Sequence, residues 1–237
     1  MSASWLICMP TVPKRHELMM RQLALLLPQL EPYCGAVQVL GWRNEGYPPL
    51  GQIRDEMLKA ASDPLSCFDY VSFVDDDDLV AEDFVSSVMT ALKSGPDHVG
   101  FQVEYWLRGS YRYLCDHSLR HRKWQWNLRG PDRQRVKLLR DFTHLDPIRT
   151  SIAVKASFAG RGSGQGEDRT WVEGLRPRLS LAAGSTEAYI DRPLYRYLWT
   201  PEESAWVSRS AARCAAGVHV HEPLPEHPYL TWHPESI

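Results

Sequence analysis

The sequence predicts an α/β fold in which one mixed sheet is flanked by helices. Three observations lead to this prediction. Apolar runs alternate with amphipathic stretches of helical periodicity over the first ~95 residues. A run of β-forming residues at 68–74 ends directly in four aspartates, as expected at the carboxyl end of a buried strand. The length of 237 residues suits one substantial core better than two full domains.

Two strand–helix units open the chain. The run "WLICMP" at 5–10 predicts a strand, and the leucines and methionines that follow, up to Leu30, recur at helical spacing. The runs "AVQVL" at 36–40 and "GQIRDEMLKAA" at 51–61 repeat this order of strand and helix. The third strand, at 68–74, leads into the aspartates, and the pattern that resumes at Leu79 predicts a third helix.

The composition changes after residue 103. Residues 105–140 hold ten Lys/Arg against two Asp, with six Tyr/Trp interleaved. Beyond them, "TSIAVKASF" at 150–158 predicts a strand, "AGRGSGQG" a flexible turn, and "EDRTWVEGL" at 167–175 a helix that opens with acidic residues. The segment 187–199 predicts a strand or hairpin, and the Pro- and His-rich segment 219–234 an irregular end.

Composition and charge describe a globular protein. Apolar residues make up 43% of the chain and charged residues 24%, and the net charge is -2, which excludes general disorder. The five cysteines are widely spaced without a C-x-x-C pair, so we expect a reducing compartment and no zinc or redox site. Without a signal-like start or an apolar run of ~18 residues, we expect a cytoplasmic protein with no membrane span.

The four aspartates at 75–78 need a physical explanation, because adjacent carboxylates repel one another. A solvated turn that caps the helix expected from Leu79 is the structural alternative, but one aspartate would suffice for that. A hard divalent cation such as Mg²⁺ or Mn²⁺, which binds carboxylate and phosphate oxygens, explains the run better. A calcium loop is disfavoured because the D-x-D-x-D-G spacing is missing.

A family resemblance rests on several of these motifs. The strand ending in "SFVDDDD" (72–78), followed about ninety residues later by "GEDRTW" (166–171), resembles the GT-A fold glycosyltransferases of the broad family-two type, including small phage-encoded members. The opening "ICMPTVPKR" (7–15) looks like the first strand and nucleotide-binding turn of that family. The segment "GQIRDEML" (51–58) is similar to its G-x-x-R-N helix start, with Asp55 where Asn is usual. The resemblance spans roughly residues 5 to 200.

The resemblance implies an activity and a division of the chain. It implies metal-dependent transfer of a sugar from a nucleotide-diphosphate sugar, such as a UDP-sugar, to an acceptor hydroxyl. We expect a Rossmann-type sheet with a nucleotide-sugar-binding half at 1–100, an acceptor half with the catalytic base at 101–200, and a closing segment at 201–237.

Residue by residue, the resemblance assigns the donor end of the site. Asp75 falls at the first acid of the D-x-D motif, near ribose and metal, and Asp77 at the metal-binding acid. Because the four aspartates are consecutive, the D-x-D motif could be shifted by one residue. Its two acids would then be Asp76, at the nucleotide, and Asp78. The resemblance also implies nucleotide contacts from Pro10, Thr11 and Arg54, and a C-terminal histidine on the metal, His219 or His221.

The acceptor hydroxyl must lose a proton as it attacks, and a metal-free carboxylate suits that task. Asp168 is the candidate base, with Glu167 as its orienter or as a sugar-hydroxyl acceptor. The alternative is an acidic helix start favoured by the helix dipole. Direct activation by Asp168 predicts inversion at the anomeric carbon, and retention stays open. Trp171 is expected to pack within its helix rather than to stack on a sugar.

Residues 105–140 raise the question of the acceptor. Basic residues interleaved with aromatics suit a phosphate backbone and exposed bases. The densest part holds Arg120, Arg122, Lys123, Trp124 and Trp126. A solvated helix face with aromatics packed beneath it is the alternative. The resemblance implies DNA carrying 5-hydroxymethylpyrimidine as acceptor, with surface glycans and small molecules left open.

Two rival functions fit parts of the sequence. A metal-dependent phosphohydrolase that uses Asp75 and Asp77 would need the Asp strand to open the domain, but two strand–helix units precede it here. A non-catalytic nucleic-acid-binding module would be driven by residues 105–140. Such a module has no use for the aspartates, which repel phosphate unless a metal is bound.

Overall fold

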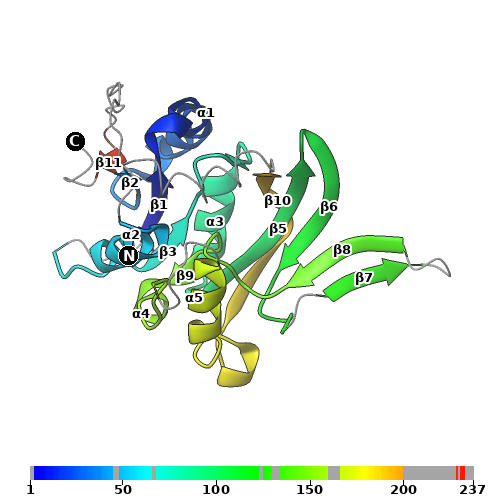
Figure 1. Ribbon diagram of the computed structural model, residues 1–237. Coiled ribbons are helices and arrows are strands. Elements are labelled where there is room, and N and C mark those ends of the chain that lie inside the picture. Colours follow the sequence, from blue (N-terminus) through cyan, green and yellow to red (C-terminus); the bar gives the residue numbers. More distant parts are fainter. Residues whose placement is uncertain are drawn as a thin grey trace.

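The structure is a computed structural model (Figure 1). It describes residues 3–44, 48–65, 68–122, 125–129, 134–159, 166–199, 228 and 230–232.

A mixed sheet runs through the described part of the molecule. Its strand order is β11-β2-β1-β3-β9-β5-β6-β8-β7, and β10 pairs with β5 and β4. The strands are β1 (Trp5–Thr11), β2 (Val37–Arg43), β3 (Tyr70–Phe73), β4 (Leu79–Val80), β5 (His98–Leu107), β6 (Ser110–His117), β7 (Gln125–Arg129), β8 (Gln134–Arg140), β9 (Ile148–Arg149), β10 (Glu187–Trp199) and β11 (Leu230–Trp232). The first four in this order are parallel, and β9 joins β3 to β5 as an antiparallel link.

Helices cover both faces of the sheet (Figure 1). They are α1 (His16–Leu26), α2 (Leu50–Ala61), α3 (Phe84–Leu92), α4 (Thr150–Ala153) and α5 (Glu167–Leu175). Short 3₁₀ turns lie at Pro13–Arg15, Leu27–Gln29, Glu31–Tyr33 and Leu181–Ala183. The described architecture is the predicted α/β fold.

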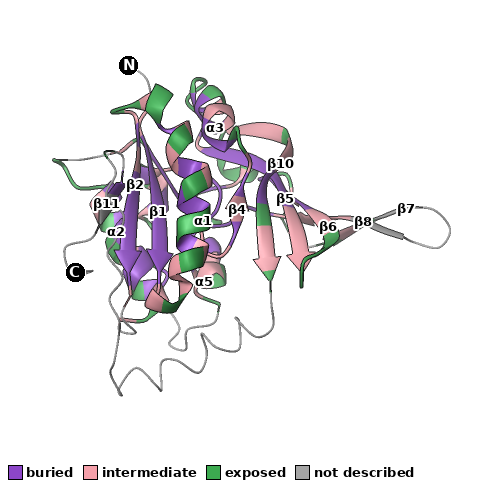
Figure 2. Cartoon of the chain, turned by 90° about the horizontal axis from the view of Figure 1, so that it is seen from above, coloured by how far each residue is buried: buried purple, intermediate pink, exposed green. Residues whose placement is uncertain are grey.

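The alternation of side chains along β1 explains the two cores. Trp5, Ile7 and Met9 pack on one face with residues of α1 and α3. Leu6 and Cys8 pack on the other face with residues of α2 and α5. β1 is buried along its whole length (Figure 2) and is apolar up to its last residue, Thr11, as expected for a strand of a parallel sheet that is covered on both faces.

The described residues of the region 105–140 form strands and connecting turns and no helix, so the alternative of a solvated helix face is wrong. Strands β5 and β6 form a hairpin whose two-residue turn, Arg108–Gly109, has positive φ at both positions, as a tight hairpin turn of the primed type requires. We call β6, β7 and β8 the arm. Figure 1 shows β7 and β8 extending past β6 at one side of the sheet.

Three local expectations are corrected. The helix expected from Leu79 begins at Phe84, because Leu79 and Val80 instead pair with β10. The strand expected at 150–158 is the short helix α4 followed by a turn, because the preceding Ile148–Arg149 already fills the place beside β3. In the segment expected to be irregular, Leu230–Trp232 forms a strand parallel to β2.

The segment 187–199 is one strand rather than a hairpin. It pairs in parallel with β5, and its register shifts on both sides of Pro193, which cannot donate to the ladder. Among the described residues, no helix has the length and apolar character needed to cross a membrane.

Candidate functional site

The four aspartates alternate between partly exposed and buried positions. The side chains of Asp75 and Asp77 are 20% and 17% exposed, whereas Asp76 and Asp78 are 2% and 0% exposed as residues. The four residues form a turn after β3, closed by a hydrogen bond of 3.3 Å from the backbone N–H of Asp78 to the carbonyl of Asp75. Only the Asp75-x-Asp77 pair therefore presents its carboxylates outward.

The two buried aspartates hold the surrounding backbone and side chains. Asp76 accepts hydrogen bonds from Thr11 Oγ1 at 2.6 Å and from Arg15 Nη1 at 2.9 Å. Asp78 accepts from the hydroxyl of Tyr195 at 2.8 Å and from the backbone N–H of Leu198 at 2.7 Å. These bonds tie the aspartate segment to β1 on one side and to β10 on the other.

Burial and mutual repulsion change the acidity of this cluster. Burial, with the charges of Asp77 and Asp75, raises the pKa of Asp78 well above its usual range. Burial also raises the pKa of Asp77 to about 7, and Asp76 and Asp75 add to this effect while Arg15 opposes it. Arg15 Nη2 lies 3.0 Å from Asp77 Oδ2. A further positive charge at Asp77 would relieve this repulsion.

Arg54 stands between the aspartates and the start of α5. Its guanidinium is buried and forms ion pairs with Asp75, at 2.8 Å, with Glu167, at 3.5 Å, and with Asp168. Although burial opposes its charge, Asp168, Asp75 and Glu167 raise the pKa of Arg54. The guanidinium, which we expected to meet nucleotide phosphates, is thus engaged by carboxylates of the chain itself.

Three other residues expected at the nucleotide are also buried. Pro10 and Thr11 lie at the buried end of β1, and Asp76 lies beneath the surface with them. Of the five residues expected to contact the nucleotide, Asp75 alone has a side chain that is partly exposed.

The acidic pair at the start of α5 lies against Arg54. Gly166, with φ of 90°, supplies the left-handed conformation that turns the chain into the helix. The Asp168 side chain is 38% exposed and that of Glu167 is 16% exposed. Burial and the charge of Asp168 raise the pKa of Glu167, against the effect of Arg54. Asp168 is therefore the more accessible carboxylate of the two.

Close packing of α2 against the segment before α5 brings these groups together. A side chain at Gly51 would place its Cβ 2.9 Å from the carbonyl oxygen of Phe158. α2 and this segment can therefore lie this close only because Gly51 has no side chain. Trp171 is buried, stacks on Phe158 and donates to the carbonyl of Ala153, which confirms the expectation that it packs in the interior.

Three residues of this site, Arg15, Tyr195 and His144, could not be assigned from the sequence. Arg15 lies in the opening motif, which by itself gives this residue no role. Tyr195 and His144 carry no periodic signal, because one lies in β10 and the other in the wholly buried loop 141–147. The one signal for His144 is the polar sequence "DFTHLDP", unusual for a buried segment. His144 lies 3.2 Å from both Asp75 and Asp168.

Two of the described residues expected to bind the acceptor, Arg120 and Trp126, lie on opposite faces of the sheet. Arg120 is exposed, and its guanidinium lies over the ring of Tyr189, 5.3 Å from its centroid. The hydroxyl of Tyr189 accepts from Gln102 of β5 at 3.4 Å. Arg120 thus lies on the face of β5 that carries Gln102.

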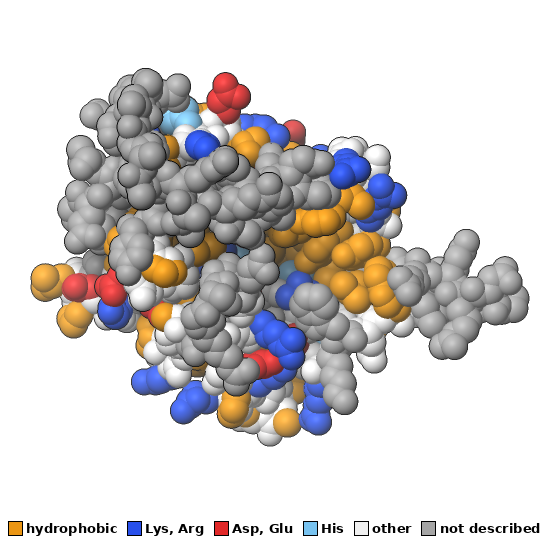
Figure 3. All heavy atoms as spheres, in the orientation of Figure 1, with side chains coloured by type: hydrophobic (Ala, Val, Ile, Leu, Met, Phe, Trp, Pro, Cys, Tyr) orange, Lys and Arg blue, Asp and Glu red, His pale blue; other side chains and the backbone are white. Residues whose placement is uncertain are grey.

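Trp126 lies on the other face of β5. Its ring is 4.8 Å from that of Tyr113, which stacks on Tyr105 at 4.9 Å. Tyr105 is three residues from Gln102, and an odd separation along a strand places two side chains on opposite faces. Figure 3 shows hydrophobic side chains gathered where β5, β6 and β10 lie. Arg122 is exposed, whereas Lys123, Trp124, His219 and His221 lie outside the described residues.

The residues present fit a hard divalent cation. Within the described parts of the chain, no group of three or more His, Cys, Asp or Glu side chains could hold a metal ion by itself. Mg²⁺ and Mn²⁺, however, commonly take only one or two carboxylates together with phosphate oxygens of a substrate. Asp75 and Asp77 offer two partly exposed carboxylates of this kind.

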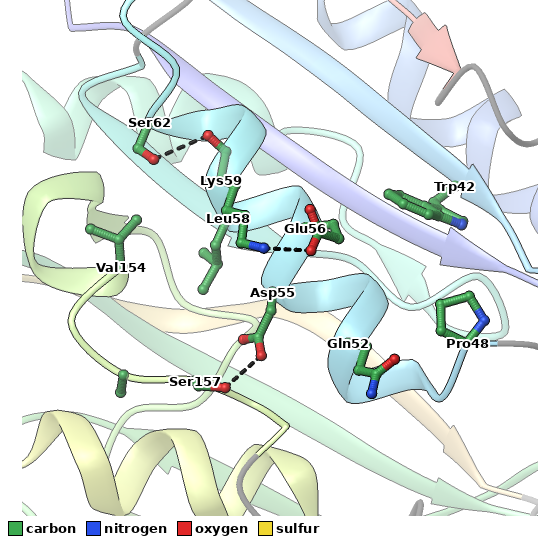
Figure 4. A pocket seen from close by; sticks show the side chains of 11 residues that line it. Trp42, Pro48, Gln52, Asp55, Glu56, Leu58, Lys59, Ser62, Val154 and Ser157 are labelled. Atoms are coloured by element: carbon green, nitrogen blue, oxygen red, sulfur yellow. Dashed lines mark hydrogen bonds and ion pairs between the residues drawn. The ribbon is translucent and has the colours of Figure 1, made fainter.

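A separate cavity of about 680 Å³ lies on the outer side of α2 (Figure 4). Asp55 and Ser157 line it together, and Asp55 accepts from Ser157 Oγ at 2.5 Å and from the backbone N–H of Phe158 at 2.7 Å. Asp55 thus holds the segment before α5. Neither Asp75 nor Asp168 is among the described residues that line this cavity.

Comparisons with known proteins bear on the fold. The sequence matches no protein-family model, and no curated protein is similar to it. Solved structures are similar to it in three dimensions. The crystal structure of TarS from S. aureus has a TM-score of 0.55 and 13% sequence identity, over 89% of this chain and 39% of TarS.

The fragment TarS 1–349 has been crystallised with two ligands. Its complex with UDP has a TM-score of 0.55 at 14% identity and covers 89% of this chain and 65% of the fragment. Its complex with UDP-GlcNAc has a TM-score of 0.54 at 13% identity, and the match covers 89% of this chain and 66% of the fragment. The chain thus spans about two fifths of TarS. At this identity the likeness concerns the fold, and the described chain has the GT-A type of α/β fold.

Proposed function

We propose that this chain is a metal-dependent glycosyltransferase, which moves a sugar from a UDP-sugar to an acceptor hydroxyl. One observation carries the proposal: a carboxylate at the end of β3, Asp75, and a carboxylate at the start of α5, Asp168, meet at the buried guanidinium of Arg54. Glycosyl transfer needs two such acidic groups, one at the departing diphosphate and one at the acceptor.

The donor end consists of Asp75 and Asp77. The fold shared with TarS, which has been crystallised with UDP and with UDP-GlcNAc, supports a UDP-sugar as donor. A bound Mg²⁺ or Mn²⁺ would supply positive charge to the departing diphosphate. Asp75 and Asp77 would hold this ion, and His219 or His221 would add a nitrogen ligand. Arg15 keeps Asp76 paired, and Arg54 keeps Glu167 paired.

The acceptor end consists of Asp168, with Glu167 beside it. The acceptor oxygen attacks the anomeric carbon, the bond from that carbon to the diphosphate oxygen breaks, and Asp168 takes the hydroxyl proton. UDP leaves with the electron pair of the broken bond. A single in-line displacement of this kind inverts the anomeric centre.

The acceptor in our proposal is a hydroxyl presented beside the arm. DNA that carries 5-hydroxymethylpyrimidine is the acceptor that the family resemblance implies, with Arg120, Arg122 and Lys123 on phosphates. A surface glycan or a small molecule is the alternative, and the opposite placement of Arg120 and Trp126 on β5 favours neither acceptor.

The experiment that tests the proposal has two stages. First, thermal unfolding is measured with UDP, GDP or ADP, in Mn²⁺ or in EDTA. A ligand that binds only the folded state raises the melting temperature, and we expect this for UDP with Mn²⁺. Second, a panel of UDP-sugars is incubated with unmodified and hydroxymethylated DNA, with glycans and without acceptor. The proposal would be contradicted if the chain bound none of the nucleotides and released sugar from none of the donors.

A further inference from the structure

We propose that His144 is a positioning residue, which sets the carboxylates of Asp75 and Asp168 relative to each other. The inference deepens the proposed function and rests on it. It assigns to one buried imidazole the coupling between the donor end and the base end of the site.

The imidazole lies between the two carboxylates. Nε2 is 3.2 Å from Asp75 Oδ2, and Nδ1 is 3.2 Å from Asp168 Oδ1. Arg54 reaches the other oxygen of Asp75, Oδ1, at 2.8 Å. Both oxygens of Asp75 are therefore held, one by each basic side chain, and the plane of this carboxylate is set.

The contacts to Asp168 involve one of its two carboxylate oxygens. Both Arg54 Nη1 and His144 Nδ1 approach its Oδ1. Among the residues that the structure describes, none is bonded to Asp168 Oδ2. The contacts thus orient the carboxylate through one oxygen and leave the other for a proton from the acceptor.

The backbone of His144 is fastened to the strand that carries Asp75. Its carbonyl accepts a hydrogen bond at 2.8 Å from the N–H of Phe73, the last residue of β3. The ring of Phe73 also meets the imidazole edge-on, with centroids 6.1 Å apart. Movement of His144 relative to the end of β3 would break both contacts.

The loop that carries His144 is also fastened to α5. Asp141 accepts from Arg176 Nε, at the end of α5, at 2.6 Å. Within the loop, Asp146 accepts from the N–H of Thr143 at 2.6 Å and lies 3.1 Å from Nδ1 of the buried His117. The loop 141–147 therefore joins β3 and α5, the two elements that carry Asp75 and Asp168.

Three variants separate the two contacts of the imidazole. His144→Ala removes both. His144→Asn keeps an amide near the position of Nδ1, which faces Asp168, and His144→Gln keeps one near Nε2, which faces Asp75. The control is His121→Asn, which removes an imidazole 3.3 Å from Asp116 on the arm.

The measurements are UDP affinity with Mn²⁺ by calorimetry, and kcat and KM for hydrolysis of the UDP-sugar that the wild type turns over. His144→Ala should lower kcat about tenfold or more, because a misplaced reacting group is costly, and should weaken UDP binding. Compared with His144→Ala, His144→Asn should recover most of kcat, and His144→Gln should recover UDP affinity and KM. His121→Asn should leave kcat, KM and UDP affinity at their wild-type values. Circular dichroism checks that each variant is folded.

Two results would overturn the inference. One is a folded His144→Ala variant with wild-type kcat and UDP affinity. The other is equal loss of both quantities in His144→Asn and His144→Gln with a lowered melting temperature, which is the signature of a merely structural residue. A wild-type chain that neither binds UDP nor hydrolyses any UDP-sugar overturns the proposed function itself, so the two failures are distinguishable.

Discussion

Arg54 Nη2 donates to Asp75 Oδ1 across 2.8 Å, and this ion pair joins α2 to the segment that follows β3. The same guanidinium meets Glu167 and Asp168 at the start of α5. One buried cation thus compensates three carboxylates from two separate parts of the chain.

Replacement of Arg54 by Met should destabilise the fold strongly. Removing one partner of a buried ion pair leaves uncompensated charge and costs about 3–5 kcal/mol. Urea unfolding at neutral pH measures the change. The matched control is Arg169→Met, since Arg169 is exposed and pairs with Glu173 one turn away, and such pairs contribute only about 0.5 kcal/mol. Equal effects of the two substitutions would contradict the role of Arg54.

Replacement of Asp77 by Asn should abolish metal-dependent UDP binding. The substitution keeps the shape of the side chain and removes the charge that would hold Mg²⁺ or Mn²⁺. Calorimetry with UDP, in Mn²⁺ and in EDTA, measures the loss. Asp63→Asn, at an exposed position after α2, is the control and should bind UDP as the wild type does. Wild-type affinity that persists in EDTA would reject the metal bridge.

Replacement of Asp168 by Asn should separate binding from chemistry. A base acts on the acceptor proton and contributes little to donor affinity, so UDP binding should persist while transfer falls roughly 10²-fold or more. Calorimetry and a transfer assay on the same preparation give both quantities. If transfer stays near the wild-type rate, Glu167 becomes the next candidate for the base.

Stability should depend on pH through the buried His98. Burial opposes its charge, but Asp146 and Glu187 outweigh this and raise the pKa of His98 to about 9. The charged groups that face it are these two carboxylates, at 3.6 and 3.1 Å. A histidine whose pKa is raised on folding stabilises the protein fully below its unfolded value, ~6.5, and this contribution disappears as pH rises through the folded value.

Urea unfolding at pH 6 and at pH 9.5 measures this effect. Between these two pH values the free energy of unfolding of the wild type should fall by roughly 2–3 kcal/mol more than that of His98→Gln. His121→Gln, in the segment that follows β6, should lose as much free energy of unfolding over this interval as the wild type. An identical pH dependence for wild type and His98→Gln would show that His98 does not carry it.

The arm offers a test of the acceptor. If Arg120, Arg122 and Lys123 contact phosphates, replacing all three by Gln should weaken DNA binding and flatten its salt dependence, because each phosphate contact releases counterions. Trp126→Ala should leave the salt dependence unchanged, since Trp126 lies on the face of β5 opposite to Arg120. Fluorescence anisotropy with labelled DNA at several salt concentrations measures both. A triple variant with the wild-type slope would direct the search to glycans or small molecules.

Much of the fold could be predicted from local sequence. The elements β1, α1, β2, α2 and β3 follow from patterns of apolar residues with the period of a helix or the continuity of a buried strand. The helix α5 follows from its acidic start after a glycine. These signals lie within the elements themselves, so no distant contact is needed to interpret them.

The corrected elements depend on distant partners. Leu79 and Val80 form a strand because β10, far along the chain, lies beside them. Residues 150–153 form a helix although they are rich in β-forming side chains, because the place beside β3 is already occupied by Ile148 and Arg149. Pairing of this kind is a property of the assembled sheet, which local propensity does not contain.

In the candidate site, too, some features follow from local sequence and others depend on tertiary packing. The sequence by itself determined that carboxylates end a buried strand at 75–78 and open a helix at 167–168, since both facts follow from residue type and position along an element. Only the tertiary structure decided that Asp75 and Asp77 are partly exposed while Asp76 and Asp78 are buried, and that Arg54 and His144 lie between Asp75 and Asp168. These outcomes depend on how β1, β10, α2 and the loop 141–147 pack around the strand end, and burial of a charged group is decided by the partners that packing brings to it.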